Sequence, residues 1–364
     1  MTSHPPVAAA PGGGAYSRRV IEDDTPDRDW TAPGIFRCAP GVHRIPLPLP
    51  NDGLRAVNVY AIEDDAGWTL IDSGWALAES RELLGTALAA LGAGFADVHR
   101  FLVTHVHRDH YTQAVALRRE FGTRVALGRG EQPSLAAINS PGPGGLVRHE
   151  LLARAGAQDL IDRLTGPPPD HDVSVWEFPD EWISDGDEIV LGDPAAPRRL
   201  RAVHTPGHTD GHVVFADDAA GLLFAGDHVL PTITPSIGLQ PVAGRGSPLA
   251  DFLDSLELMR RRPDAVLLPA HGNTGMRVHE RVDELLAHHA KRLDATLAAV
   301  QDGHSTAYQV AAVLPWTRRD RRLAELDLFN AMLATTETLA HLRVLAERGA
   351  VTVTETDGVA YYAV

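Results

Sequence analysis

The sequence is poor in cysteine, and this absence excludes two kinds of architecture. Cys38 is the single cysteine among 364 residues, so the chain has no internal disulfide framework and no metal site built from several cysteines. A chain without disulfides fits a reducing compartment. We therefore expect a cytoplasmic protein.

Long apolar runs and an excess of basic residues are also missing. No run approaches the roughly 18 residues that a membrane span requires. Arg18-Arg19 is followed by acidic residues and not by the apolar core of an export signal. The formal charge is −15, which gives polyanions no general electrostatic attraction. We expect no membrane partner and, on this balance of charge, no nucleic-acid partner.

Composition divides the chain into an arm, a large domain and a tail. Residues 1–33 are rich in proline and glycine and offer little apolar surface, so we expect a mobile N-terminal arm. Residues 34–299 are long enough for one large core. Within them, the segment 129–182 is rich in helix-breaking residues around an expected helix over 148–164.

That insert has two interpretations. A helix between breakers, inserted between core strands, is typical of a lid that covers a substrate site. Its apolar walls would then be Leu151, Leu152, Trp176 and Trp182. The equal alternative is a packed surface excursion that contacts no ligand.

The tail, residues 300–364, has a pattern of its own. Helical periodicity over 305–314, 322–333 and 335–348 is followed by two short apolar strands around Asp357-Gly358. Three helices and a hairpin predict a small winged-helix domain. The tail carries six basic and eight acidic residues, whereas nucleic-acid domains usually present a basic face.

The stretch with the most chemistry is FLVTHVHRDHYTQ, residues 101–113. His105 and His107 lie two residues apart, so on an extended segment they project to the same side. Asp109 and His110 follow at the start of an expected helix over 111–121. Imidazole nitrogens and carboxylates are the ligands that zinc-like ions prefer. The pattern predicts a metal site, with a solvated polar turn as the alternative.

The same arrangement recurs at the ends of other expected strands. Apolar strands over 101–103, 200–203, 221–225 and 265–268 each end in a turn that bears histidine or aspartate. A further strand, over 68–71, ends in Asp72. Because ligands in α/β proteins gather at the carboxyl ends of strands, we expect these turns to meet at one edge of a sheet.

These motifs carry a family resemblance. HVHRDH, TPGHTDGH, AGDH and PAHG, in this order and at these intervals, resemble the metallo-β-lactamase-fold hydrolases over residues of about 40–295. With its tail, the chain is similar to the beta-lactamase-like protein 2 group. The resemblance implies an α/β fold, the αββα sandwich, with a C-terminal winged-helix domain.

The resemblance also implies a ligand set. One metal would be held by His105, His107 and His208, the other by Asp109, His110 and His271, and Asp227 would bridge them. Two divalent ions are expected, with zinc as the first choice and iron or manganese as alternatives. Asp72 would orient a ligand, and His204 and His212 would flank the ligand turn. His228, beside the bridge, is a candidate for reaching substrate, and Asp109 a candidate for orienting the attacking hydroxide.

One departure from the family pattern concerns substrate. Thr112 and Gln113 replace the paired glycines of HxHxDHxGG hydrolases, which puts glyoxalase II and lactonase substrates in doubt.

The expected function is metal-dependent hydrolysis of a small ester or thioester, such as an acyl thioester or a lactone-like molecule, by a metal-activated hydroxide. The alternatives are a phosphodiesterase or ribonuclease, and a non-catalytic binding module on the same fold. A small molecule is the expected partner. The oligomeric state stays open, with a homodimer as one option.

Overall fold

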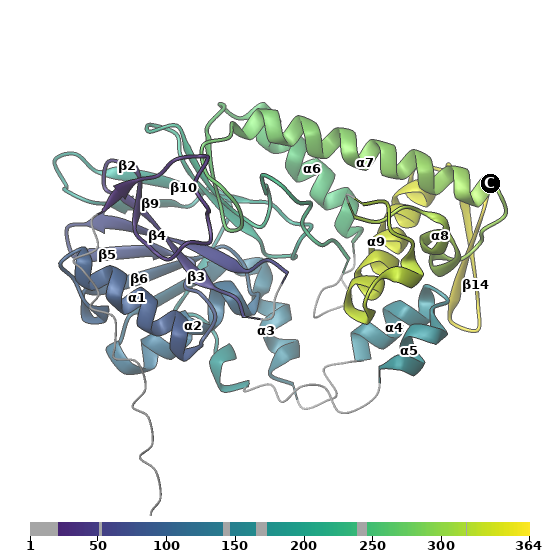
Figure 1. Ribbon diagram of the computed structural model, residues 1–364, viewed down its shortest axis with the longest axis horizontal. Helices are drawn as coiled ribbons and strands as arrows, with labels where there is room; N and C mark the ends of the chain where they lie inside the picture. The colour runs from purple at the N-terminus through teal and green to yellow at the C-terminus, as the bar shows by residue number, and fades with distance from the viewer. Residues whose placement is uncertain (1–20, 51–52, 141–145, 165–172, 239–245, 318) are drawn as a thin grey trace, which may run out of the picture.

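The computed structural model describes residues 21–50, 53–140, 146–164, 173–238, 246–317 and 319–364, and it contains two large β-sheets (Figure 1). In the first, eight strands lie side by side in chain order. They are β1 (Glu22–Asp23), β2 (Phe36–Ala39), β3 (Val42–Pro48), β4 (Ala56–Asp64), β5 (Gly67–Ile71), β6 (Val98–Val103), β7 (Arg124–Gly128) and β8 (Glu181–Ile183).

The second sheet has five strands in the order β13-β12-β11-β10-β9. Their bounds are β9 (Glu188–Leu191), β10 (Arg198–His204), β11 (Val213–Asp217), β12 (Leu222–Gly226) and β13 (Val266–Pro269). β12 and β13 are parallel, whereas the other neighbours pair antiparallel. The strands expected over 200–203, 221–225 and 265–268 are confirmed as β10, β12 and β13.

Alternation along the strands sorts the core into layers. On β4, Val57 and Val59 face the helices α1 (Ala78–Ala90) and α2 (Arg108–Phe121), whose apolar side chains share one buried cluster with them. Tyr60 and Ile62 point the other way and meet side chains of the second sheet. Successive residues of a strand project to opposite faces, so a strand buried on both faces needs such a continuous apolar run.

Apolar side chains of α6 (Pro248–Arg261) and of the start of α7 (Val278–Gln301) share a buried cluster with the outer face of the second sheet, and α7 runs on to the tail (Figure 1). Helices therefore enclose two sheets that face each other, and the expected αββα sandwich is confirmed. None of the helices in the described part of the chain combines the length and the apolar character that crossing a membrane requires.

The expected arm divides into two parts. Residues 1–20 lie outside those that the structure describes. Residues 21–33, in contrast, pack on the sandwich, and Asp24 forms an ion pair with Arg44 in which the two side chains are 3% and 1% exposed. The prediction of a mobile arm as far as residue 33 is therefore wrong for 21–33, because polar contacts, pairing of β1 with β2 and the packing of Ile21 hold this segment.

The tail follows α7 and contains α8 (Ala307–Val313), α9 (Leu328–Glu347) and the hairpin of β14 (Thr352–Thr356) and β15 (Val359–Ala363). The hairpin is confirmed. The helices expected over 322–333 and 335–348 are instead one helix, which begins where the Asp327 carboxylate caps the Asn330 N–H at 2.9 Å. No breaker separates the two halves of α9. The winged-helix assignment stays a prediction.

The insert contributes α3 (Gln132–Ile138), α4 (Leu146–Arg154) and α5 (Gln158–Arg163). Short 3-10 helices also occur, namely η1 (Phe95–Asp97), η2 (Arg129–Glu131), η3 (Val173–Trp176) and η4 (Leu323–Glu325). In Figure 1, α4 and α5 lie beside α8, α9 and the hairpin, away from α1 and α2. The Tyr308 N–H at the start of α8 donates to the Ala155 carbonyl at 2.9 Å, which ties the insert to the tail.

This packing corrects part of the lid prediction. Leu152 is fully buried in the cluster that α7, α8 and α9 build, and Leu151 packs against the same cluster. A side chain enclosed in this way presents no wall to a substrate. The apolar face of the helix was evident from its sequence, but its packing partner was not.

Leu152→Ala should lower the free energy of unfolding by about 2–5 kcal/mol, because it leaves a cavity among α4 and the tail helices. Leu151→Ala, at a partly buried site, is the matched control and should cost less. Chemical denaturation compares the variants. Unchanged stability of Leu152→Ala, together with an altered preference for acyl length, would restore the lid interpretation.

Candidate metal centre

The sequence-predicted ligands meet at one edge of the sandwich, where several strands end. β5 ends just before Asp72, β6 just before the 104–107 turn that leads into α2, β12 just before Asp227, and β13 two residues before His271. The turn after β10 carries His208. Two adjoining groups of donors result, and within each group the ligand atoms lie within 4.8 Å of one another: His105, His107, His208 and Asp227 in the first, and Asp109, His110 and His271 in the second.

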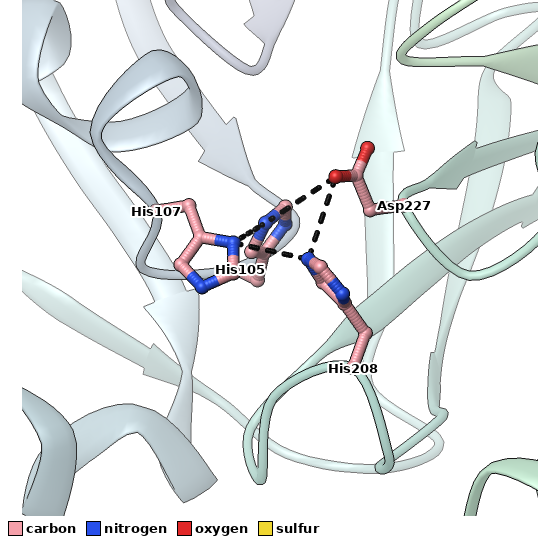
Figure 2. A group of neighbouring side chains, drawn as sticks. All are labelled: His105, His107, His208 and Asp227. Carbon is pink, nitrogen blue, oxygen red and sulfur yellow. Dashed lines mark hydrogen bonds and ion pairs between the residues drawn. The ribbon is translucent and has the colours of Figure 1, made fainter. Parts of the chain in front are cut away.

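In the first group, ring nitrogens face a common point (Figure 2). His107 Nδ1 lies 3.0 Å from both His105 Nε2 and His208 Nε2. Nitrogens placed about 2.0–2.1 Å from a tetrahedral ion are separated by about 3.3 Å. The spacing is therefore close to that of a ligand set around one cation.

The second group has similar spacing. Asp109 Oδ2 lies 3.4 Å from His110 Nε2 and 3.4 Å from His271 Nε2. Asp109 and His110 come from the first turn of α2, whereas His271 comes from the turn after β13. Two elements far apart in the chain thus supply one compact set of donors.

Asp227 lies between the groups and turns one oxygen to each. Its Oδ2 is 3.4 Å from His208 Nε2 in the first group. Its Oδ1 is 3.3 Å from His271 Nε2 and 3.7 Å from His110 Nε2 in the second. A carboxylate in this position can neutralise charge between two cations, which is the bridging role that the family resemblance implied.

Outward hydrogen bonds determine which nitrogen of each ring carries the proton. His208 Nδ1 lies 2.8 Å from the Ser236 carbonyl, and His271 Nδ1 lies 2.7 Å from the Ala56 carbonyl. A carbonyl oxygen only accepts, so Nδ1 of each ring is the donor. Nε2 is then left with a lone pair that points into the centre.

Asp72 imposes the same arrangement on two further rings. Its Oδ2 accepts from His110 Nδ1 at 2.8 Å. Its Oδ1 accepts from the Thr104 hydroxyl at 3.0 Å, and Thr104 Oγ1 lies 3.0 Å from His105 Nδ1. One buried carboxylate therefore orients a histidine in each group, as metal-ligating histidines commonly require.

The electrostatics fit the binding of cations. Burial, and after it the neighbouring His208, lowers the pKa of His107 to about 3, so the ring is neutral at pH 7. Burial lowers the pKa of His110, but the carboxylates of Asp109 and Asp72 raise it well above the ordinary value. In the described residues, the buried atoms His110 Nε2, His271 Nε2 and Asp227 Oδ1 have no hydrogen-bond partner. Ring nitrogens and a carboxylate oxygen in this arrangement are suited to binding divalent metal ions.

The other predicted histidines differ in position. His212 is buried beside the first group, where its Nε2 accepts the Asp227 N–H at 3.1 Å and its Nδ1 lies 2.8 Å from Thr205 Oγ1. His204 lies outside both groups and contacts the Asp210 carbonyl at 2.8 Å. It is partly exposed.

The expectation that His228 reaches substrate is wrong. Its side chain is fully buried, and its ring packs edge-on to Phe252 with 5.2 Å between centroids. The chain turns at Gly226, and Asp227 faces the metal centre while its neighbour points into the core. Although Asp227 and His228 are adjacent in the sequence, their side chains therefore point in different directions.

The two tryptophans of the insert pack on the first sheet and its helices. Trp176 stacks on Tyr111 of α2, with ring centroids 6.4 Å apart. Trp182 lies on β8 and meets Phe178 edge-on at 6.1 Å. Both belong to the partly buried rim of the cluster that contains α1 and α2.

Sequence reasoning missed Glu131, which is fully buried at the end of η2. Its Oε1 accepts the Val106 N–H at 3.4 Å and the Thr209 hydroxyl. Val106 stands between two ligands, and Thr209 follows a third. Glu131 thus joins the two turns that build the first group. Its sequence signal was only an acidic residue soon after an apolar strand.

Comparisons with known proteins agree with this geometry. The family model described as the metallo-beta-lactamase superfamily matches residues 52–271. The probable metallo-hydrolase YqjP of Bacillus subtilis is 24% identical over 316 residues, which cover 85% of this chain and 92% of the relative. The solved metallo-beta-lactamase family protein TTHA1429 of Thermus thermophilus is 30% identical with a TM-score of 0.72, over 90% of this chain and 99% of that chain.

Shorter matches have more specific names. A hydroxyacylglutathione hydrolase of Rhizobium johnstonii is 29% identical over 178 residues, 48% of each chain. The atrochrysone carboxyl ACP thioesterase of Aspergillus fumigatus is 29% identical over 102 residues, 28% of this chain and 22% of the relative. A beta-lactamase-like protein 2 homolog of Caenorhabditis elegans is 28% identical over 155 residues, 41% of this chain and 48% of the relative. The resemblance inferred from the motifs is confirmed.

The buried position of Glu131 predicts a pH-dependent stability. Burial raises the pKa of this carboxyl from its ordinary 4.5 to about 7, although the Thr209 hydroxyl lowers it. Folding therefore favours the protonated form. The stability that the protonated Glu131 carboxyl contributes to the folded state is fully present below about pH 4.5 and is lost as the pH rises through 7. Relative to Glu131→Gln, the free energy of unfolding of the unmodified protein should fall by about 3 kcal/mol over that interval.

Urea unfolding of both proteins at matched metal concentrations, from pH 4.5 to 8, measures this difference. Gln keeps an acceptor oxygen for Val106 and does not titrate. Parallel stability curves across the interval would contradict the prediction.

Proposed function

This chain belongs to the metallo-β-lactamase superfamily, and we propose that it hydrolyses a small acyl thioester or ester with two divalent cations, most often zinc in such sites. The observation that carries the proposal is the pair of adjoining groups of candidate ligands, with Asp227 in the first group and 3.3 Å from His271 of the second. The histidine rings whose nitrogens converge there are fixed by hydrogen bonds at their outer nitrogens, so the ligand atoms are already placed for binding cations.

Each residue of the site has a separate role in the proposed reaction. When bound, the cations lower the pKa of water toward about 7 and polarise the scissile carbonyl. Asp227 keeps negative charge between the two positions. Asp109, whose side chain is 13% exposed, is the most open of the donors in the second group and can accept a hydrogen bond from an incoming water. Asp72 and the carbonyls behind the rings bind the outer ring nitrogens and so fix the orientation of the histidines.

Two observations favour an acyl substrate. Two relatives with partial matches are named as a thioesterase and a hydroxyacylglutathione hydrolase, whose bond type is the thioester. The net charge of −15 opposes the approach of a polyanion. No side-chain nucleophile is required, and Cys38 has a strongly raised pKa because of burial, which keeps its thiol protonated.

The residues that replace the paired glycines have structural contacts. Thr112 accepts the Ala76 N–H at 3.0 Å, and Gln113 donates to the Ser73 carbonyl at 3.0 Å. Both are buried next to the Asp72 turn. They tie α2 to that turn, and neither belongs to the two groups of candidate metal ligands, so this departure does not oppose thioester chemistry.

The zinc-loaded protein should turn over members of a panel of acyl thioesters and leave labelled single-stranded RNA intact. Chelation should abolish turnover, and added metal should restore it. Asp227→Ala should reduce kcat/KM at least about 100-fold, beyond the usual cost of losing an outer-shell partner. His204→Ala is the matched control and should remain near the unmodified rate.

Cleavage of RNA without turnover of any thioester would overturn the acyl assignment in favour of a phosphodiesterase. Two bound cations without turnover of either class would favour a binding module.

A further inference from the structure

The segment 21–33 is joined to the 269–275 loop, which carries His271. The Thr274 hydroxyl donates to Asp24 Oδ2 at 2.6 Å. The side-chain amide of Asn273 donates to two backbone carbonyls of the segment, at 2.6 and 2.7 Å. The loop therefore depends on a segment that lies about 250 positions earlier in the chain.

A buried ion pair extends this connection to both sides of the ligand. Arg44 donates to both carboxylate oxygens of Asp24, at 2.8 and 2.7 Å. It also donates to Asn58 Oδ1 at 3.0 Å. The Asn58 amide in turn donates to the carbonyls of Pro269 at 2.9 Å and Gly272 at 3.0 Å, which flank the ligand. The planar guanidinium fork makes this a fixed arrangement.

The segment also reaches the ligand itself. Arg44 Nη1 donates to the Trp30 carbonyl at 2.9 Å. The indole of Trp30 lies edge-on to the His271 ring, with 6.4 Å between the centroids and an angle of 75°. The Nδ1–H of His271 donates to the Ala56 carbonyl at 2.7 Å. The ring therefore contacts both the segment and the start of β4.

We infer that residues 21–33 hold the loop of the second cation site in place, and that Asp24 is a positioning residue for His271. His271 is the one ligand on the 269–275 loop, and it belongs to the second group. Loosening this loop therefore weakens the second cation site and leaves the first unaffected. The inference rests on the proposed function only in that the second group binds a cation.

Asp24→Asn tests this, because it keeps the volume of the side chain and removes the charge that Arg44 faces. Zinc binding is measured by competition with a chromogenic chelator, together with metal analysis and circular dichroism. The affinity for the second zinc should fall about tenfold or more, as for other outer-shell partners, while the first is unchanged. Glu22→Gln is the matched control, since Glu22 is 53% exposed and pairs with Arg28 in the same segment. It should bind both ions normally.

Thr274→Val provides a milder variant in case Asp24→Asn does not fold, and it should weaken the second site in the same direction. The inference is overturned if a folded variant binds both ions as the unmodified protein does, if it loses both equally, or if the unmodified protein binds only one. The titration needs no turnover. Two bound zinc ions without thioester hydrolysis would refute the proposed function and leave this inference testable by the same variants.

Discussion

The metal centre depends on hydrogen bonds that keep protons on the outer nitrogens of its histidines. Asp72 is central because it accepts from His110 directly and lies one hydroxyl, that of Thr104, from His105. Its φ of 59° lies in the left-handed region that non-glycine residues rarely adopt. Such a conformation persists where the surroundings over-determine it, and here it aims the carboxylate at both donor groups.

Buried carboxylates that are not ligands organise the rest of the site. Asp72 serves both groups, Glu131 joins the two turns of the first, and Asp24 supports the loop of the second. Each is enclosed, so each hydrogen bond acts in a medium of low polarity, where removing one partner is costly. These hydrogen bonds therefore keep the ligand atoms in place, although their convergent lone pairs repel one another.

The candidate ligands could be named from the sequence because the motifs that carry them are local and resemble the family pattern. Four of them lie on the single stretch 105–110, and the other three follow apolar strands. Glu131 and Asp24 could not be predicted, since their partners lie 78 and 250 residues away. The same limit explains Leu152: periodicity showed an apolar helix face, but only tertiary packing decided that it meets the tail. The single helix α9, in contrast, agrees with a feature of the sequence, because no glycine or proline interrupts residues 328–347.

A centre that binds two cations is tested most directly by locating bound metal with anomalous X-ray diffraction at the zinc absorption edge. Two peaks are expected, each about 2.0–2.2 Å from its nitrogen and oxygen ligands, one beside His105, His107 and His208, and one beside Asp109, His110 and His271. The Asp227 carboxylate should contact both. A single peak, or a second peak bound by other residues, would contradict this arrangement.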